Sequence, residues 1–121
     1  MALEIIFSKG SRGRSEFAEY MLELNKKSRT SKQEKSLLKK IDLHLDLLEE
    51  FDTRPDIGRH QVKRLTKELW EIRPGHVRIL FSVQGNKIVL LNHFFKKTDK
   101  TPDRELKKGN RLLKKWLEEQ K

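Results

Sequence analysis

The stretch from Leu69 to Lys97 constrains the fold of this chain most strongly, because two turn signals divide it into three strands. It reads LWEIRPGHVRILFSVQGNKIVLLNHFFKK, with turn residues at Pro74-Gly75 and Gly85-Asn86. Pro-Gly suits the central positions of a type II turn, and Gly-Asn suits a two-residue hairpin turn, since Gly and Asn tolerate positive φ. The pattern therefore predicts an antiparallel meander of three strands.

Two-residue loops set the register that we expect for this meander. They place Glu71 opposite Arg78 and Arg78 opposite His93, so that Arg78 is central on one exposed face. The other face is apolar enough to be the core, with Trp70, Ile72, Val77, Ile79, Phe81, Val83, Ile88, Leu90 and Phe94. A bulge anywhere in the meander would exchange the faces beyond it.

The exposed face is predicted to be cationic and suited to phosphate chemistry. Arg73 joins Arg78 there, and two guanidiniums can hold a phosphate bidentately and stabilise the charge that develops in phosphoryl transfer. His93 is a candidate general acid or base, because imidazole titrates near neutral pH. The structural alternatives are a cross-strand ion pair between Glu71 and Arg78 and a purely structural His93.

Further basic residues follow the meander and precede it. Strand alternation points Lys97 to the Arg78 face and Lys96 to the core side, and Lys100 and Arg104 lie at the start of the last expected helix, whose N-terminus attracts anions. Lys63, Arg64 and Lys67 are candidate backbone contacts to nucleic acid. No His or carboxylate spacing favours zinc, so we expect neither a metal nor a cofactor.

The charge of the chain is distributed unevenly along its 121 residues. Residues 1 to 51 hold 10 Lys and Arg against 9 Asp and Glu, whereas residues 52 to 121 hold 18 against 9. This excess favours a polyanionic partner, although a soluble lysine-rich surface is an equally simple reading. The chain has no cysteine and no apolar run long enough to span a bilayer, so we expect one soluble, cytoplasmic domain over residues 1–121, without membrane contact.

The remaining elements place helices beside the sheet. A strand is expected from Leu3 to Ser8 and a helix from Ser15. A second helix follows the capping box Ser31-Glu34 and ends near Phe51, before the stop at Arg54-Pro55. A short strand within His60 to Leu65 and a last helix with Pro102 as its first residue complete the order. The expected class is α+β: an antiparallel sheet of four to five strands, the two N-terminal helices on one face, and a C-terminal helix.

The motifs LWEIR-x-G-x-x-RILF, IVLLNHFFKK and T-P-x-x-E resemble the RelE/HigB-type toxins of bacterial type II toxin–antitoxin systems, especially the phage-derived HigB-like branch. The resemblance is strongest from Leu65 to Leu113. It implies a small RelE-like fold and ribosome-dependent cleavage of messenger RNA, in which the ribose 2′-hydroxyl attacks the adjacent phosphate without a metal. It also implies a HigA-like helix-turn-helix antitoxin, with operator DNA bound only through the toxin–antitoxin complex.

The same resemblance assigns roles to individual residues. Arg73 and Arg78 fall at basic positions of the active sheet, and Lys96 or Lys97 falls at the basic residue after the last strand. Glu71 falls where relatives can have a base, and His93 is in a position to supply the acid. Several relatives carry a tyrosine or histidine near the catalytic C-terminal end, whereas the only tyrosine here is Tyr20, so Phe95 or Trp116 is the candidate for base stacking.

Two other functions remain open at this point. A ParE-like gyrase inhibitor has the same fold and binds a protein without phosphoryl transfer. A non-catalytic RNA-binding module needs only basic charge, whereas catalysis requires Glu71, Arg78 and His93 on one face.

Overall fold

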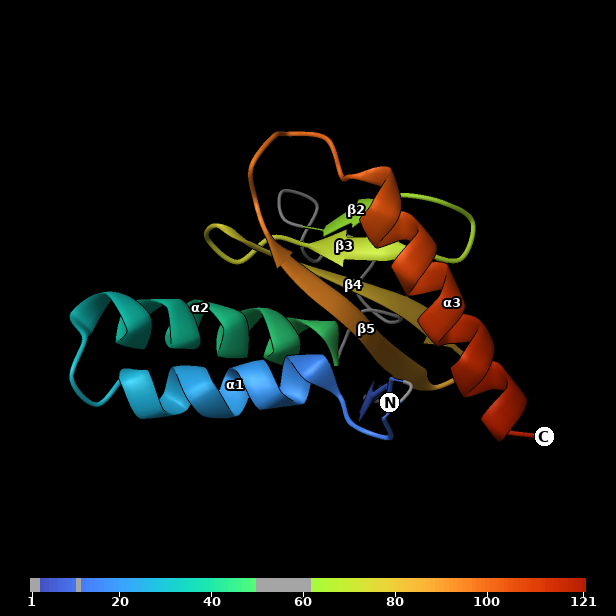
Figure 1. Cartoon of the computed structure of the whole chain (residues 1–121), viewed down its shortest axis with the longest axis horizontal. Helices are drawn as coiled ribbons and strands as arrows, with labels where there is room; N and C mark the ends of the chain where they lie inside the picture. Colours follow the sequence, from blue (N-terminus) through green and yellow to red (C-terminus); the bar gives the residue numbers. More distant parts are fainter. Residues whose placement is uncertain (1–2, 11, 50–61) are drawn as a thin grey trace.

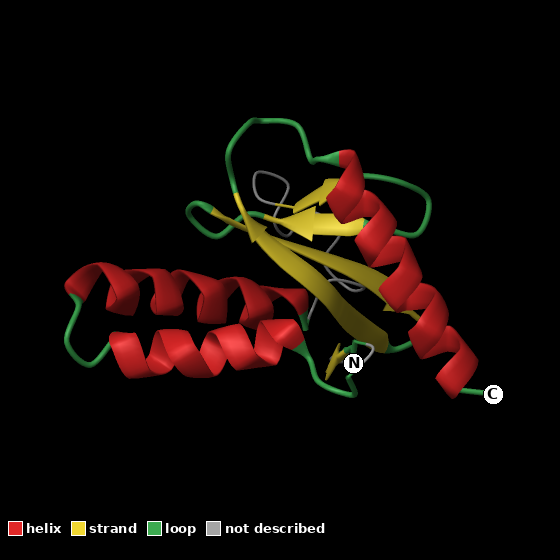
Figure 2. Cartoon of the chain, in the orientation of Figure 1, coloured by secondary structure: helices red, strands yellow, loops and turns green. Residues whose placement is uncertain are grey.

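The computed structural model describes residues 3–10, 12–49 and 62–121, which form a sheet with helices against both faces (Figures 1 and 2). The elements are β1 (Glu4–Phe7), α1 (Glu16–Lys27), α2 (Lys32–Leu48), β2 (Val62–Arg64), β3 (Trp70–Ile72), β4 (Val77–Gln84), β5 (Lys87–Phe95) and α3 (Asp103–Glu119). This order confirms the expected α+β class. The helix end expected near Phe51, the stop at Arg54-Pro55 and His60 lie outside the described residues.

The five strands form one mixed sheet in the order β1-β5-β4-β3-β2. Strands β2 to β5 are antiparallel neighbours, as predicted. Strand β1, however, runs parallel to β5, from Glu4 opposite Lys87 to Phe7 opposite Leu90, so the expectation of a wholly antiparallel sheet is wrong here. Parallel pairing needs a long connection, which the segment between β1 and β5 provides, and the residue pattern of a short strand does not encode its direction.

Serine caps start the two N-terminal helices. The Ser15 side chain accepts a hydrogen bond from the Ala18 amide at 3.1 Å, and that of Ser31 accepts one from the Glu34 amide at 3.3 Å. These bonds satisfy amides that have no partner within the helix, and the second confirms the helix start predicted at Ser31. The third helix begins at Asp103 with Pro102 as its N-cap, one residue later than predicted.

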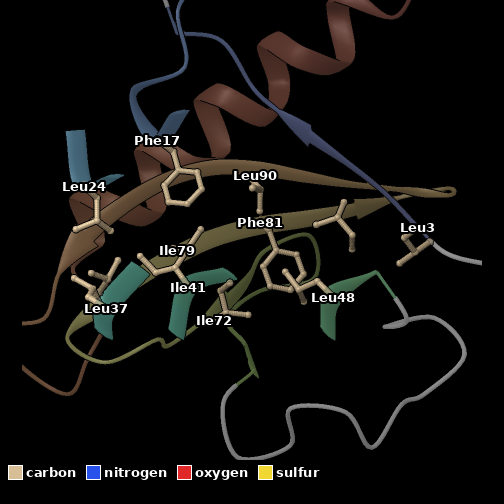
Figure 3. Close-up of a cluster of buried hydrophobic side chains, with 12 residues drawn as sticks. Leu3, Phe17, Leu24, Leu37, Ile41, Leu48, Ile72, Ile79, Phe81 and Leu90 are labelled. Carbon is tan, nitrogen blue, oxygen red and sulfur yellow. The ribbon is translucent and has the colours of Figure 1, made fainter. Parts of the chain in front are cut away.

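The main core lies between the sheet and the helices α1 and α2 (Figure 3). Its fully buried side chains come from both layers: Phe17, Leu24, Ile41 and Leu48 from the helices, and Ile72, Ile79, Phe81, Ile88 and Leu90 from the sheet. The predicted core face of the meander is therefore confirmed, except at its C-terminal end, where β5 departs from the expected register.

Helix α3 covers the other face of the sheet, which the sequence pattern left exposed. Leu69, Val89, Leu91 and Leu113 form a second buried cluster there. The contact is close at Gly109, where a Cβ would meet Asn92 Oδ1 at 3.1 Å and Leu80 Cδ1 at 3.3 Å.

Candidate phosphate-binding site

The β3–β4 turn brings two arginines together. The Val77 amide donates to the Pro74 carbonyl at 3.1 Å, so the central residues of the turn are Gly75 and His76, one position later than predicted. Gly75 has a φ of 61°, which suits a primed turn. The twist of a primed turn matches that of the flanking strands, whereas the type II turn predicted from Pro-Gly would splay the strands.

This turn changes the pairing of the first hairpin without exchanging its faces. Glu71 lies opposite Leu80, so the expected pair of Glu71 with Arg78 is wrong. Continued one residue toward the turn, the register that pairs Ile72 with Ile79 sets Arg73 opposite Arg78. Like charges directly opposite one another are unfavourable in a sheet. Burial, and then the charge of Arg73, lower the pKa of Arg78, while Arg73 itself forms an ion pair with Glu71 at 2.8 Å.

A bulge in β5 overturns the predicted position of His93. The register of the second hairpin is as expected from Gln84–Lys87 to Phe81–Leu90, but it shifts by one residue between Phe81 and Ile79. Beyond the bulge, Phe94 lies opposite Arg78 and His93 lies opposite Ile79. His93 consequently faces α1, and Phe94 takes the place beside Arg78.

Glu71 is a buried carboxylate with two partners. It is 1% exposed, accepts a hydrogen bond from Arg73 Nε at 2.8 Å and accepts one from the Thr101 hydroxyl at 2.6 Å. The first contact holds Arg73 on the sheet, and the second ties the segment between β5 and α3 to β3. Glu71 thus positions other groups and is not open to substrate.

Arg78 is the cation of this cluster that has no direct ion pair among the described residues. Its guanidinium donates to the carbonyls of Gly75 at 2.8 Å and Val77 at 3.0 Å. Burial, and then the neighbouring charge of Arg73, lower the pKa of Arg78, which nevertheless remains a guanidinium that is charged at neutral pH. The charges of Glu71 and Asp99 partly oppose this effect without forming an ion pair with Arg78.

Lys96 joins this cluster through an exposed carboxylate. Its Nζ lies 3.0 Å from Asp99, and this contact, with smaller effects of Arg73 and Arg78, lowers the pKa of Asp99. Lys96 thus lies with the arginines, contrary to the expected core-side orientation. Because the Asp99 side chain is 97% exposed, its pairing with Lys96 is weak and easily exchanged for another anion.

A pocket of about 400 Å³ adjoins the cation cluster at the end of β5. Its walls combine aromatic and basic residues: His93, Phe94, Phe95, Lys97, Thr98, Lys100, Pro102 and Arg104. Phe95 is 48% exposed, which is unusual for a large aromatic side chain. The predicted residues Lys97, Lys100 and Arg104 therefore share one concave surface beside the arginines.

His93 lies in an aromatic cluster between β5 and α1. Its ring stacks on Tyr20 with centroids 4.6 Å apart and lies 5.6 Å from Phe17. Burial lowers the pKa of His93, and the nearby Glu16 only partly opposes this effect. Nδ1 is enclosed without a hydrogen-bond partner among the described residues.

The basic residues before β3 separate into two groups. Lys63 lies opposite Glu71 and so shares the face of the arginines. Arg64 lies on the other face, 5.0 Å from the Trp70 ring centroid, and donates to the carbonyls of Thr66 and Lys67. Lys67 is exposed in the loop between β2 and β3.

Within the described ranges, no group of three or more His, Cys, Asp or Glu side chains could hold a metal ion.

Sequence reasoning missed Thr101, Asp99 and the position of Tyr20. Thr101 appeared only as the first residue of the T-P-x-x-E motif, and Asp99 was not singled out. Tyr20 lies 73 residues before His93 in the chain, and no local pattern indicates that the two rings stack.

A profile of the family described as Phage derived protein Gp49-like (DUF891) matches residues 28–114. The chain belongs to this Gp49-like family, which is part of the RelE/HigB-like toxin group. No curated protein matches the chain significantly. None of the helices in residues 3–10, 12–49 and 62–121 is long and apolar enough to cross a membrane.

Proposed function

We propose that this chain is the toxin of a type II toxin–antitoxin system and that it cleaves messenger RNA on the ribosome in the cytoplasm. The observation that carries the proposal is the pair of facing arginines, Arg73 and Arg78, with Lys96 beside them. Membership of a toxin-like family supports the toxin role. The proposed partners are a HigA-like helix-turn-helix antitoxin, the ribosome with its message, and operator DNA through the antitoxin complex.

In the proposed reaction, the ribose 2′-oxygen forms a bond to phosphorus while the bond from phosphorus to the 5′-oxygen breaks. The 2′-hydroxyl proton passes to water, the leaving 5′-oxygen takes a proton from water, and the products are a 2′,3′-cyclic phosphate and a 5′-hydroxyl. Arg73 and Arg78 bind the non-bridging oxygens and stabilise the additional negative charge of the transition state. Lys96 assists them, while Lys97, Lys100 and Arg104 hold the neighbouring backbone.

The acid–base roles differ from those expected from the motif resemblance. Glu71 is enclosed by Arg73 and Thr101, so we assign it a positioning role in place of the base. His93 lines the pocket, and its lowered pKa favours the neutral imidazole at neutral pH. The bulge turns His93 toward α1, on the other side of the sheet from Arg73 and Arg78, so we do not assign it as the group that takes the 2′-hydroxyl proton.

The test compares Arg78→Ala with Arg111→Ala, which removes an exposed arginine of α3 outside the site. Arg78→Ala is expected to slow single-turnover cleavage on programmed ribosomes by roughly 100-fold or more, because it removes a group that stabilises transition-state charge. Arg111→Ala is expected to cleave at the wild-type rate. Circular dichroism serves as the control for folding.

Induction of the chain in bacteria separates the rival functions. Cleavage predicts new 5′-hydroxyl ends within translated frames. Intact messages together with accumulated gyrase-cleaved DNA would support the ParE-like alternative and overturn the proposal. Ribosome binding without cleavage by wild-type protein would leave a non-catalytic RNA-binding module.

A further inference from the structure

The end of the α1–α2 hairpin carries a second concentration of positive charge, distant in sequence from the arginine pair. We call residues 25–40 the basic tip. Seven lysines and arginines stand there against the single acid Glu34, a net charge of +6: Lys26, Lys27, Arg29, Lys32, Lys35, Lys39 and Lys40. All seven are exposed, and none forms an ion pair within the described residues.

The basic tip also stands apart in space. In Figure 1, the connection between α1 and α2 lies at the far left of the molecule, at the opposite end from the C-terminus of α3. The rest of the first 51 residues holds three basic residues against eight acids, which hides this concentration in the average composition. The connection between α1 and α2 therefore projects beyond the sheet, whereas Lys40 lies near Gly75 of the β3–β4 turn.

The charges of α2 are arranged against its own stability. Lys32 and Lys35 lie in or next to its first turn beside the single acid Glu34, Asp42 and Asp46 lie in its second half, and its last turn has no basic residue. The macrodipole favours the reverse order, with acids at the N-terminus and bases at the C-terminus. The like-charge neighbours Lys32–Lys35 and Lys35–Lys39 add repulsion at helical spacing. Folding therefore does not explain these lysines.

A pocket connects the basic tip with the β3–β4 turn. It measures about 490 Å³ and is lined by Lys32, Gln33, Ser36, Leu37, Lys40, Gly75 and His76. His76 and Leu37 also line a neighbouring pocket of about 300 Å³ that reaches Tyr20 and Phe95. Phe95 in turn lines the pocket beside the arginine pair. Shared lining residues therefore link the three pockets between the candidate site and the basic tip.

We propose that the basic tip binds the phosphate backbone of folded RNA, as a docking surface separate from the residues that contact the scissile phosphate. Unpaired lysines on a projecting helix fit a dense array of phosphates, because each contact releases condensed counterions. The choice of RNA among phosphodiester polymers rests on the proposed function. The surface supplies affinity and orientation, while the arginine pair acts on a single strand.

The test compares two double variants of the full chain with the same helical spacing and the same loss of charge. Lys32→Gln/Lys35→Gln removes two charges from the basic tip, and Arg111→Gln/Lys114→Gln removes two exposed charges from α3. Binding of a fluorescein-labelled RNA hairpin is measured by anisotropy between about 50 and 200 mM KCl. A DNA hairpin of matching sequence is the second probe.

The tip variant is expected to raise Kd for the RNA hairpin roughly tenfold at low salt and to reduce the salt slope by about 1.5, since each phosphate contact contributes about 0.7–0.9. The α3 variant is expected to bind as the wild type does. The tip variant is also expected to have a higher Tm, because its lost charges oppose the helix dipole. Weaker RNA binding with greater stability would separate a docking role from a structural one.

Three results would overturn the inference. They are equal losses of binding in both variants, tighter binding of the DNA hairpin than of the RNA hairpin, and a fall in Tm of the tip variant. Because this assay measures binding alone, a wild-type protein that cleaves no message would refute the proposed nuclease function without deciding the role of the tip.

Discussion

Thr101→Val tests whether the buried carboxylate of Glu71 holds the segment between β5 and α3 in place. The substitution replaces a hydroxyl with a methyl group of similar size, so it removes one hydrogen bond and leaves the packing nearly unchanged. The lost bond joins the Thr101 hydroxyl to Glu71 Oε2 at 2.6 Å, and both residues are buried, at 7% and 1% exposure. The substitution leaves a buried carboxylate oxygen without its partner.

The size of the effect follows from the charge of the acceptor. A hydrogen bond to a charged group contributes roughly 1.5–3 kcal/mol to stability. We therefore expect Thr101→Val to lower the free energy of unfolding by about 2 kcal/mol, which corresponds to a fall in Tm of roughly 8 °C for a chain of this length. Urea denaturation at neutral pH, followed by circular dichroism, measures the change.

A second threonine in the same segment provides the matched control. Thr98 is exposed and donates to the Lys100 carbonyl at 3.0 Å, so Thr98→Val is expected to change stability by less than about 0.5 kcal/mol. Thr101→Val is also expected to reduce cleavage, because Lys96 and Lys100 lie in the segment that it releases. Equal stability of the two variants would refute the view that Glu71 and Thr101 anchor this segment.

Two further predictions concern charge. Asp99→Asn removes the carboxylate that neutralises the cation cluster, so we expect it to tighten RNA binding, measured by anisotropy; weaker binding would show that Asp99 orders Lys96. Burial lowers the pKa of His93 below 6.5, so the unfolded chain binds a proton at this residue more readily than the folded chain does. The contribution of the neutral His93 to the free energy of unfolding should therefore be lost as pH falls below about 6.5. His93→Phe should reduce the difference in unfolding free energy between pH 7.5 and 5, and an unchanged difference would exclude His93 as its source.

Local chemistry made much of this structure predictable. Ser31 caps α2 because its hydroxyl reaches the Glu34 amide, and Gly85 forms the second turn with a φ of 61° because glycine has no Cβ. Apolar residues alternate along β4 with a period of two, which predicts one apolar face, and this face packs on α1 and α2. Each of these features depends on residues that are close in sequence.

The site was predicted only in part. Arg73 and Arg78 share a face because a shift of two residues in the first hairpin preserves the alternation of the strands. The bulge in β5 is a shift of one, so it exchanged His93 with Phe94 and set Lys96 with the arginines. The one-residue shift therefore made the predicted positions of His93 and Lys96 wrong, whereas the two-residue shift left Arg73 and Arg78 on the predicted face.

The sequence by itself determined the elements, their caps and the cationic character of one sheet face, because propensity, capping and alternation act between near neighbours. Tertiary structure decided the parallel direction of β1, the bulge in β5 and the enclosure of Glu71. The bulge lies where Asn92 donates to Glu105 of α3 at 3.0 Å and where Gly109 lets that helix approach the sheet. These contacts join residues that are far apart in the chain, and their energies exist only once the layers have packed.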